Sequence, residues 1–171
     1  QRVRGLAKFG LVMNKEIIAQ LREWADTYND PQYFQEDPIA FPTRFAELSA
    51  RGERCLKDVE VAAVFAAHFA WGRRSMIVRD CGRLFDEMDW RPYDYVMRGV
   101  WRDEAVSVHR TIKWSEVAAI CERLKEFYEG HESLEALTVN EIRVGIFGQK
   151  EDAKAPNKKI NMMRRWMARD D

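Results

Sequence analysis

The residues best suited to chemistry in this sequence form a short group, Trp71-Gly72-Arg73-Arg74, between two stretches whose apolar residues recur at helical spacing. An indole ring can stack on a nucleobase, and neighbouring guanidinium groups can neutralise phosphates. Gly72 can adopt the backbone angles that a tight connection between two helices requires. The group therefore predicts an exposed turn in which an aromatic ring lies beside cations.

The three histidines have different sequence surroundings. His68 lies within the apolar run AAVFAAHFA, which predicts a neutral ring buried in the core, with a role in a site as the alternative. His131 follows a glycine that is expected to end a helix, which predicts a surface position. His109 and Arg110 belong to the connector segment HRT, whose donors can pin the connector to a helix end or hold an anion. Pinning is the favoured interpretation, and both residues are also candidates for contacts with nucleic acid.

A second cluster of cations lies near the end of the sequence. Apolar residues Ile160, Met163, Trp166 and Met167 share one helical face, and the basic residues around them are Lys158, Lys159, Arg164, Arg165 and Arg169. The chain has 28 basic and 28 acidic residues and no net charge. A polyanion could therefore bind only through local clusters of this kind.

Composition and missing motifs narrow the functional classes. The three cysteines show no C-x-x-C spacing, which favours reduced core thiols, a cytoplasmic location and no metal site. The sequence lacks a phosphate-binding glycine loop, a nucleophile elbow and a zinc-protease helix, so no cofactor is expected. No apolar run reaches about 18 residues and no signal peptide precedes the first expected helix, so no membrane partner is expected.

Residues 58–88 form the stretch that must position the Trp71 group. An apolar run with Asp58 as a candidate N-cap predicts one helix up to Ala70, and the spacing of Ile77, Cys81, Leu84, Phe85 and Met88 predicts a second. The first of these helices is expected to be the most buried element of the fold.

The rest of the chain also favours helices. Helical spacing covers residues 14–28, 115–130 and 158–169. Pro92 is well placed to begin a short helix and Gly99 to cap its end. Prolines at 31, 38 and 42 predict an extended, packed loop over residues 32–45. Residues 138–154 show only a weak alternation. We expect an all-α fold of six or seven helices, a single domain over residues 13–171 and an extension or cloning remnant over residues 1–12.

Several separated blocks carry a resemblance to a known family. In order, the blocks are DPIAFPTRF (37–45), DVEVAAVFAAHFAWGRR (58–74), PYDYV (92–96), HRT (109–111) and INMMRRWMARD (160–170). The chain resembles the uncharacterised bacterial family called domain of unknown function 2400 over residues 14–171. That family is in turn similar to the helix-hairpin-helix DNA glycosylases, all-helical base-excision enzymes of the endonuclease III kind.

The resemblance to glycosylases implies roles for particular residues. In those enzymes a loop between two early helices enters the DNA beside an extruded base, and Trp71, Arg73 and Arg74 occupy the matching place. A Schiff-base lysine in the bifunctional members would correspond to Lys158 or Lys159. Two features depart from the pattern. The L-P-G-V-G hairpin is missing, and the segment with the family's candidate catalytic aspartate would follow Asp171, so the chain is expected to be an incomplete domain.

Together these features favour a DNA-binding, glycosylase-like domain, with contacts from Trp71, Arg73, Arg74, His109, Arg110, Arg164 and Arg165. Two alternatives stay open: a non-catalytic module that binds a partner protein, and a small-molecule pocket between the central pair of helices and residues 32–45. The sequence leaves open whether the domain is catalytic, which base or lesion it recognises, whether it prefers DNA or RNA, and its oligomeric state.

Overall fold

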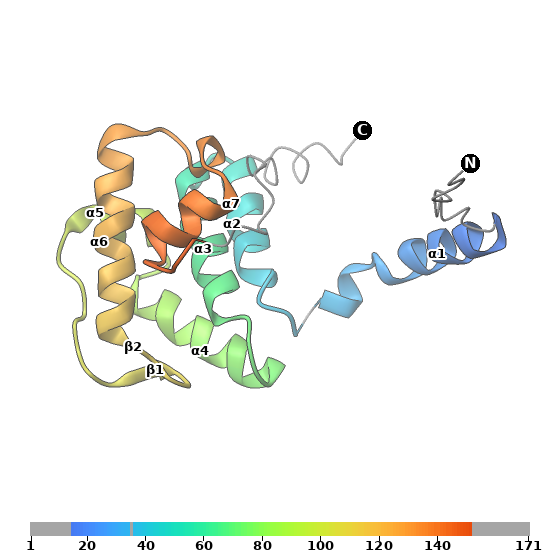
Figure 1. Ribbon diagram of the computed structural model, residues 1–171, viewed down its shortest axis with the longest axis horizontal. Helices are drawn as coiled ribbons and strands as arrows, with labels where there is room; N and C mark the ends of the chain where they lie inside the picture. The colour runs from blue at the N-terminus through green and yellow to red at the C-terminus, as the bar shows by residue number, and fades with distance from the viewer. Residues whose placement is uncertain (1–14, 35, 152–171) are drawn as a thin grey trace, which may run out of the picture. The chain divides into compact units, whose positions relative to one another are not determined.

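The computed structural model describes residues 15–34 and 36–151 of the chain (Figure 1). The chain divides into two compact units, residues 1–35 and 36–171. In the first unit, helix α1 (Lys15–Tyr28) is followed by the 3-10 turn η1 (Pro31–Phe34). Six of its large apolar side chains are exposed: Ile17, Leu21, Trp24, Tyr28, Tyr33 and Phe34. The expected single domain over residues 13–171 stays a prediction.

The described part of the second unit is mostly helical, as the sequence predicts. Its elements in order are α2 (Ala40–Ala50), α3 (Leu56–Phe69), α4 (Arg74–Glu87), α5 (Pro92–Arg98), β1 (Ser107–His109), β2 (Ile112–Lys113), α6 (Trp114–Gly130), η2 (Leu134–Ala136), α7 (Val139–Glu141) and the π-helical turn η3 (Ile142–Ile146). None of the helices in the described ranges is long and apolar enough to cross a membrane.

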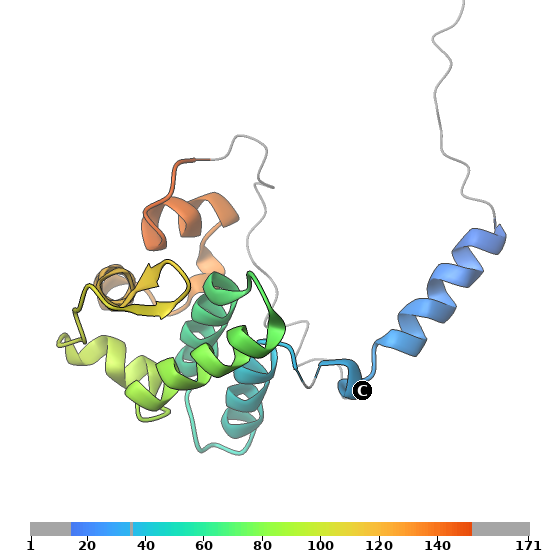
Figure 2. The same ribbon diagram turned by 90° about the horizontal axis from the view of Figure 1, so that it is seen from below.

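Helix α3 lies in the middle of the second unit. Figures 1 and 2 both show it between α2 and α6. Nine of its 14 residues are buried, and Val61, Ala62, Phe65 and Phe69 are fully inaccessible to solvent. The expected burial of this helix is confirmed. The core that surrounds it also contains Phe45, Leu84, Phe85, Val117 and Leu124.

The expected extended loop over residues 32–45 is wrong. Residues 31–34 form η1, and α2 begins at Ala40, so that Phe41 and Phe45 lie one turn apart on its buried face. Pro42 is the third residue of α2. The first turn of a helix has N–H groups without intrahelical partners, so a proline there costs no hydrogen bond.

Buried carboxylates join α3 to its neighbours. The sequence had predicted Asp58 as the N-cap of α3, but Asp58 lies in the first turn of the helix. Its carboxylate accepts hydrogen bonds from the N–H of Cys55 and from the N–H of Tyr93 in α5. Glu60 is 2% exposed and accepts hydrogen bonds from the hydroxyls of Tyr128 and Ser133. Each buried charge is therefore satisfied by donors from another element.

The connector before α6 contains an antiparallel hairpin that the sequence analysis missed. Strands β1 and β2 pair His109 with Ile112, and Arg110 occupies the turn with a positive φ of 52°. Figure 1 shows this hairpin beside α4 at one end of α6. The short helix α5 begins at Pro92 and ends before Gly99, as predicted; Gly99 has a φ of 75°. The hairpin places HRT next to the Trp71 group.

Candidate functional site

The α3–α4 loop, residues 70–73, is short because Gly72 reverses the chain direction. Gly72 has a φ of 113°, a backbone conformation that residues other than glycine rarely adopt. The N–H of Trp71 donates to the carbonyl of Phe69, which marks a tight turn directly after α3. The predicted connection between two helices at Trp71-Gly72 is confirmed, and the whole loop is exposed.

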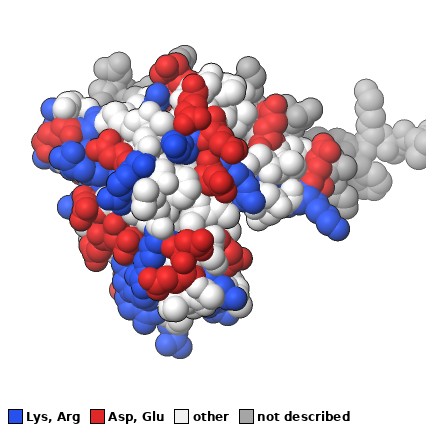
Figure 3. All heavy atoms as spheres, turned by 90° about the vertical axis from the view of Figure 1, so that its left-hand side faces the viewer, with Lys and Arg blue, Asp and Glu red and all other residues white. Residues whose placement is uncertain are grey.

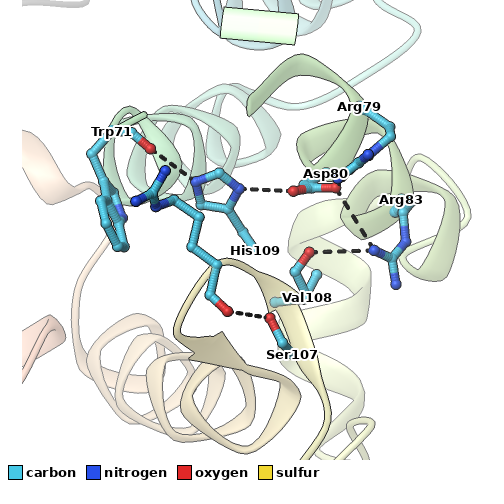
Figure 4. Close-up of polar contacts among 8 residues, drawn as sticks. Trp71, Arg79, Asp80, Arg83, Ser107, Val108 and His109 are labelled. Carbon is cyan, nitrogen blue, oxygen red and sulfur yellow. Dashed lines mark hydrogen bonds and ion pairs between the residues drawn. The ribbon is translucent and has the colours of Figure 1, made fainter. Parts of the chain in front are cut away.

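His109 connects the β1–β2 hairpin to this loop from the inside (Figure 4). Its side chain is buried, with Nδ1 2.8 Å from Asp80 Oδ2 in α4 and Nε2 3.1 Å from the carbonyl oxygen of Trp71. The ring stacks on Phe69 at a centroid distance of 5.2 Å, and Trp71 meets it edge to face at 5.8 Å. His109 therefore pins the connector to two helices.

Asp80 is the buried anion of the site. Arg79 Nε lies 2.8 Å and Arg83 Nη1 3.7 Å from Asp80 Oδ1, while Oδ2 faces His109. Burial acts to raise the pKa of the Asp80 carboxyl, but the hydrogen bonds and charges of Arg79 and His109 outweigh burial and hold this pKa below its usual value. Asp80 is therefore ionised at neutral pH. Arg83 Nη1 also donates to the carbonyl of Val108, 3.4 Å away, which fixes β1 to α4.

Arg110 covers one face of the Trp71 ring. Its guanidinium carbon lies 4.4 Å from the ring centroid, a cation–π arrangement. A Cβ on Gly72 would lie 2.8 Å from Arg110 Nη1, so a glycine at this position lets the guanidinium approach the loop closely. Trp71 is still 41% exposed. The loop thus presents an indole ring with a cation held against it.

Arg73 and Arg74 extend the positive charge along the start of α4. Both are exposed, and no carboxylate of the described residues lies within ion-pair distance of either one or of Arg110. On the face shown in Figure 3, acidic and basic side chains interleave, so a single sign of charge does not cover it. On this face, any attraction for a polyanion is therefore local to small groups of basic residues.

The structure brings together part of the predicted set. Trp71, Arg73, Arg74 and Arg110 lie on or beside the loop. His109 belongs to the same cluster and is buried, as the favoured pinning role requires, while its contact with nucleic acid stays a prediction. The other predicted residues lie outside the described residues: Lys158, Lys159, Arg164 and Arg165.

The other histidines and the cysteines have structural surroundings. His68 was expected to be fully buried, but its side chain is only half buried. Its ring stacks on Phe147 at a centroid distance of 5.0 Å. Burial lowers the pKa of His68, so the ring is neutral. His131 is exposed, as predicted. Cys81 and Cys121 are free, buried thiols, and burial raises the pKa of Cys81 to about 12. Cys55 is also free but exposed, so the expected core position holds for two of the three cysteines.

Sequence reasoning missed Asp80. A signal was present, because Asp80 lies between Ile77 and Leu84 on the apolar face of the predicted helix. A carboxylate on a buried face requires a donor from another element. His109, with a polar ring inside the sequence SVHRTI, was the matching donor.

The fold and site define a predominantly helical domain with an exposed, cationic aromatic loop. Residues 37–151 match the family described as "Protein of unknown function (DUF2400)". The chain belongs to this family, as its sequence blocks predicted. Comparison with curated proteins and comparison with solved structures gave no match.

Proposed function

We propose that the chain is a DNA-binding domain whose α3–α4 loop contacts the nucleic acid. One observation carries the proposal: Trp71 is exposed, with Arg110 stacked on one face, and is followed by Arg73 and Arg74, which form no ion pair with any described residue. A nucleobase can stack on an exposed indole, and guanidinium groups can neutralise the adjoining phosphates. An unpaired or extruded base is the natural ligand, because a base inside a duplex cannot offer its face to the ring.

The finer proposal is a domain similar to the helix-hairpin-helix DNA glycosylases that acts in base-excision repair. The support is the position of the loop between two consecutive helices, one of them the most buried of the unit, together with the family membership. Lys158 or Lys159 would supply the nucleophile in such an enzyme. Both lysines lie outside the described residues, so catalysis rests on the sequence resemblance.

A protein-binding module is the second candidate. The apolar face formed by α1 and η1 supports it, because six large apolar side chains between Ile17 and Phe34 are exposed there. Contiguous apolar surface of this kind is typical of binding sites for other proteins. For the small-molecule alternative the support is weaker, because three hollows that lie along α6 and beside α5 contain no residue of α3 in their lining.

Titration of the chain with labelled single-stranded and duplex DNA at two salt concentrations tests the proposal. Replacing Arg73 and Arg74 together by Ala is expected to reduce the log–log salt slope by up to about 2, since each phosphate contact contributes about 0.9 on duplex DNA. Trp71→Ala is expected to weaken binding of single-stranded DNA by about 1–3 kcal/mol, the value of one lost base stack.

The matched control removes the same charge elsewhere. Arg51 and Arg91 are exposed and form ion pairs with Glu53 and Asp94, away from the loop in sequence. The double replacement of Arg51 and Arg91 by Ala should leave binding to both DNA forms within about twofold, the variation usual for exposed ion pairs. Equal losses in the two double variants, or no binding by the unmodified chain at low salt, would move the assignment to the protein-binding module.

A further inference from the structure

The inside of the α3–α4 loop is held by one buried ring, that of His109. Its Nδ1 faces a carboxylate oxygen of Asp80 at 2.8 Å, and its Nε2 faces the main-chain carbonyl oxygen of Trp71 at 3.1 Å. Both partners are acceptors. Both contacts are therefore hydrogen bonds only when each ring nitrogen carries a proton, which makes the ring an imidazolium in this arrangement.

We propose that His109 is a positioning residue whose doubly protonated ring, held by Asp80, fixes the Trp71 carbonyl and so keeps the α3–α4 loop in its binding form. His109 itself does not touch the ligand, because its side chain is fully buried. The inference rests on the proposed function of the loop and adds a dependence of binding on a buried proton.

The bond to Trp71 is the one that the loss of a proton removes. The bond to Asp80 joins two charged groups and is the stronger of the two. A neutral ring therefore keeps its proton on Nδ1 and turns the lone pair of Nε2 toward the Trp71 carbonyl. Residues 70–73 are all exposed, so packing does little to hold the loop in its place once this bond is lost.

The other charged and titratable groups around the ring favour this behaviour. From α4, Arg79 and Arg83 face Asp80 and keep it ionised. From α3, His68 interacts electrostatically with His109, but burial lowers the pKa of His68 and leaves it uncharged. From the hairpin, the Arg110 guanidinium lies on Trp71 and keeps its charge throughout. The ring of His109 thus lies between the Asp80 carboxylate and the Trp71 carbonyl, with the cations of Arg79, Arg83 and Arg110 on the far sides of these two partners.

Two replacements of His109 separate positioning from support of the fold. The amide nitrogen of Gln reaches the place of Nε2, so H109Q keeps a donor for the Trp71 carbonyl and loses the one for Asp80. The amide nitrogen of Asn reaches the place of Nδ1, so H109N keeps the donor for Asp80 and loses the one for Trp71. Both variants remove the ring that stacks on Phe69, and H131Q, at an exposed histidine that contacts the Phe127 carbonyl, is the control.

Binding of a labelled single-stranded oligonucleotide is measured over the pH range in which histidine rings ordinarily lose a proton. At the acidic end H109N is expected to bind about three- to tenfold more weakly than the unmodified chain, the equivalent of one hydrogen bond, and H109Q nearly as well. As pH rises, binding by the unmodified chain is expected to fall toward that of H109N. Binding by H109Q should stay level, apart from the general weakening that the H131Q control also shows.

Hydrogen exchange at the backbone amide of Trp71, whose N–H donates to the Phe69 carbonyl, provides a second readout when it is measured without DNA. Faster exchange in H109N than in H109Q supports positioning, even if the chain binds no oligonucleotide and the proposed function fails. Equal exchange in the two variants overturns the inference. It is also overturned if both variants have lower melting temperatures but bind with the affinity and pH profile of the unmodified chain, because His109 would then serve the fold alone.

Discussion

Replacing Asp80 by Ala tests whether the buried ion pair supports the fold around the α3–α4 loop. Asp80 is 1% exposed and accepts from His109 and Arg79 at 2.8 Å each. The replacement leaves the buried His109 ring and the Arg79 guanidinium without the carboxylate that they share. Breaking a buried pair in this way costs about 3–5 kcal/mol, so we expect a loss of that size in the free energy of unfolding.

Asp80→Asn divides this cost into shape and charge. The amide keeps the shape of the carboxyl group and can still bond to one ring nitrogen, so we expect a smaller loss of about 1.5–3 kcal/mol, the value of a hydrogen bond to a charged group. Asp94 is the control, because its pair with Arg91 is exposed on both sides. Asp94→Ala should cost no more than about 1 kcal/mol.

The pH dependence follows from the lowered pKa of Asp80. A carboxyl group whose pKa is lower in the folded state stabilises that state at pH values above its unfolded pKa, about 3.9 for Asp. This contribution is lost as the pH falls through the lower, folded pKa. The difference in unfolding free energy between the unmodified chain and Asp80→Asn should therefore be largest near neutral pH and shrink in acid.

Urea denaturation of the three variants at neutral and acidic pH gives these free energies. A loss of less than about 1 kcal/mol in the free energy of unfolding of Asp80→Ala would refute the argument, since removal of a buried counterion is expected to cost more. A difference between the unmodified chain and Asp80→Asn that is the same at both pH values would also refute it. In that case the ionised carboxylate would not be the source of the stability.

Three further predictions concern stability and can be measured by denaturation. Gly72→Ala should destabilise the chain by more than about 1 kcal/mol because of the positive φ at residue 72. Gly82 lies in α4 with open space around a Cβ, so Gly82→Ala should stabilise the chain by about 0.5–1 kcal/mol. Similar effects at both sites would contradict this prediction. Phe45→Ala should cost about 3–5 kcal/mol because Phe45 is fully buried, and a cost near zero would place it outside the core. Tyr128→Phe should cost about 1.5–3 kcal/mol because it removes a donor to the buried Glu60, and a neutral result would show that another donor replaces it.

Helical periodicity was sufficient to identify most of the second unit. The stripe from Ile77 to Met88 and the apolar run before Trp71 became α4 and α3, since burial of one face selects such spacing. Local backbone rules also held at Pro92 and Gly99, where the start and the end of α5 depend on single residues. These features are local, so one sequence contains the information they need.

The errors arose where a local rule had two outcomes. Proline is unfavourable in the interior of a helix but is tolerated in the first turn, and Pro42 lies in the first turn of α2. The sequence over residues 32–45 therefore fitted both a loop and a helix start. The difference was decided by Phe41 and Phe45, which can both reach Phe85 only from one face of a helix.

The contacts within the candidate site depend on pairings that are distant in sequence. Asp80 and His109 are 29 residues apart, and His109 and Trp71 are 38 apart. Their approach requires β1 to lie against α4, which the turn at Arg110 and the bond from Arg83 to the Val108 carbonyl bring about. Residue types alone identified the exposed partners, Trp71 and the arginines, because stacking rings and free cations are recognisable individually. The buried partners are defined by what faces them, so the exposed residues of the loop can be predicted from the sequence, whereas the groups that hold the loop in place become apparent only in the fold.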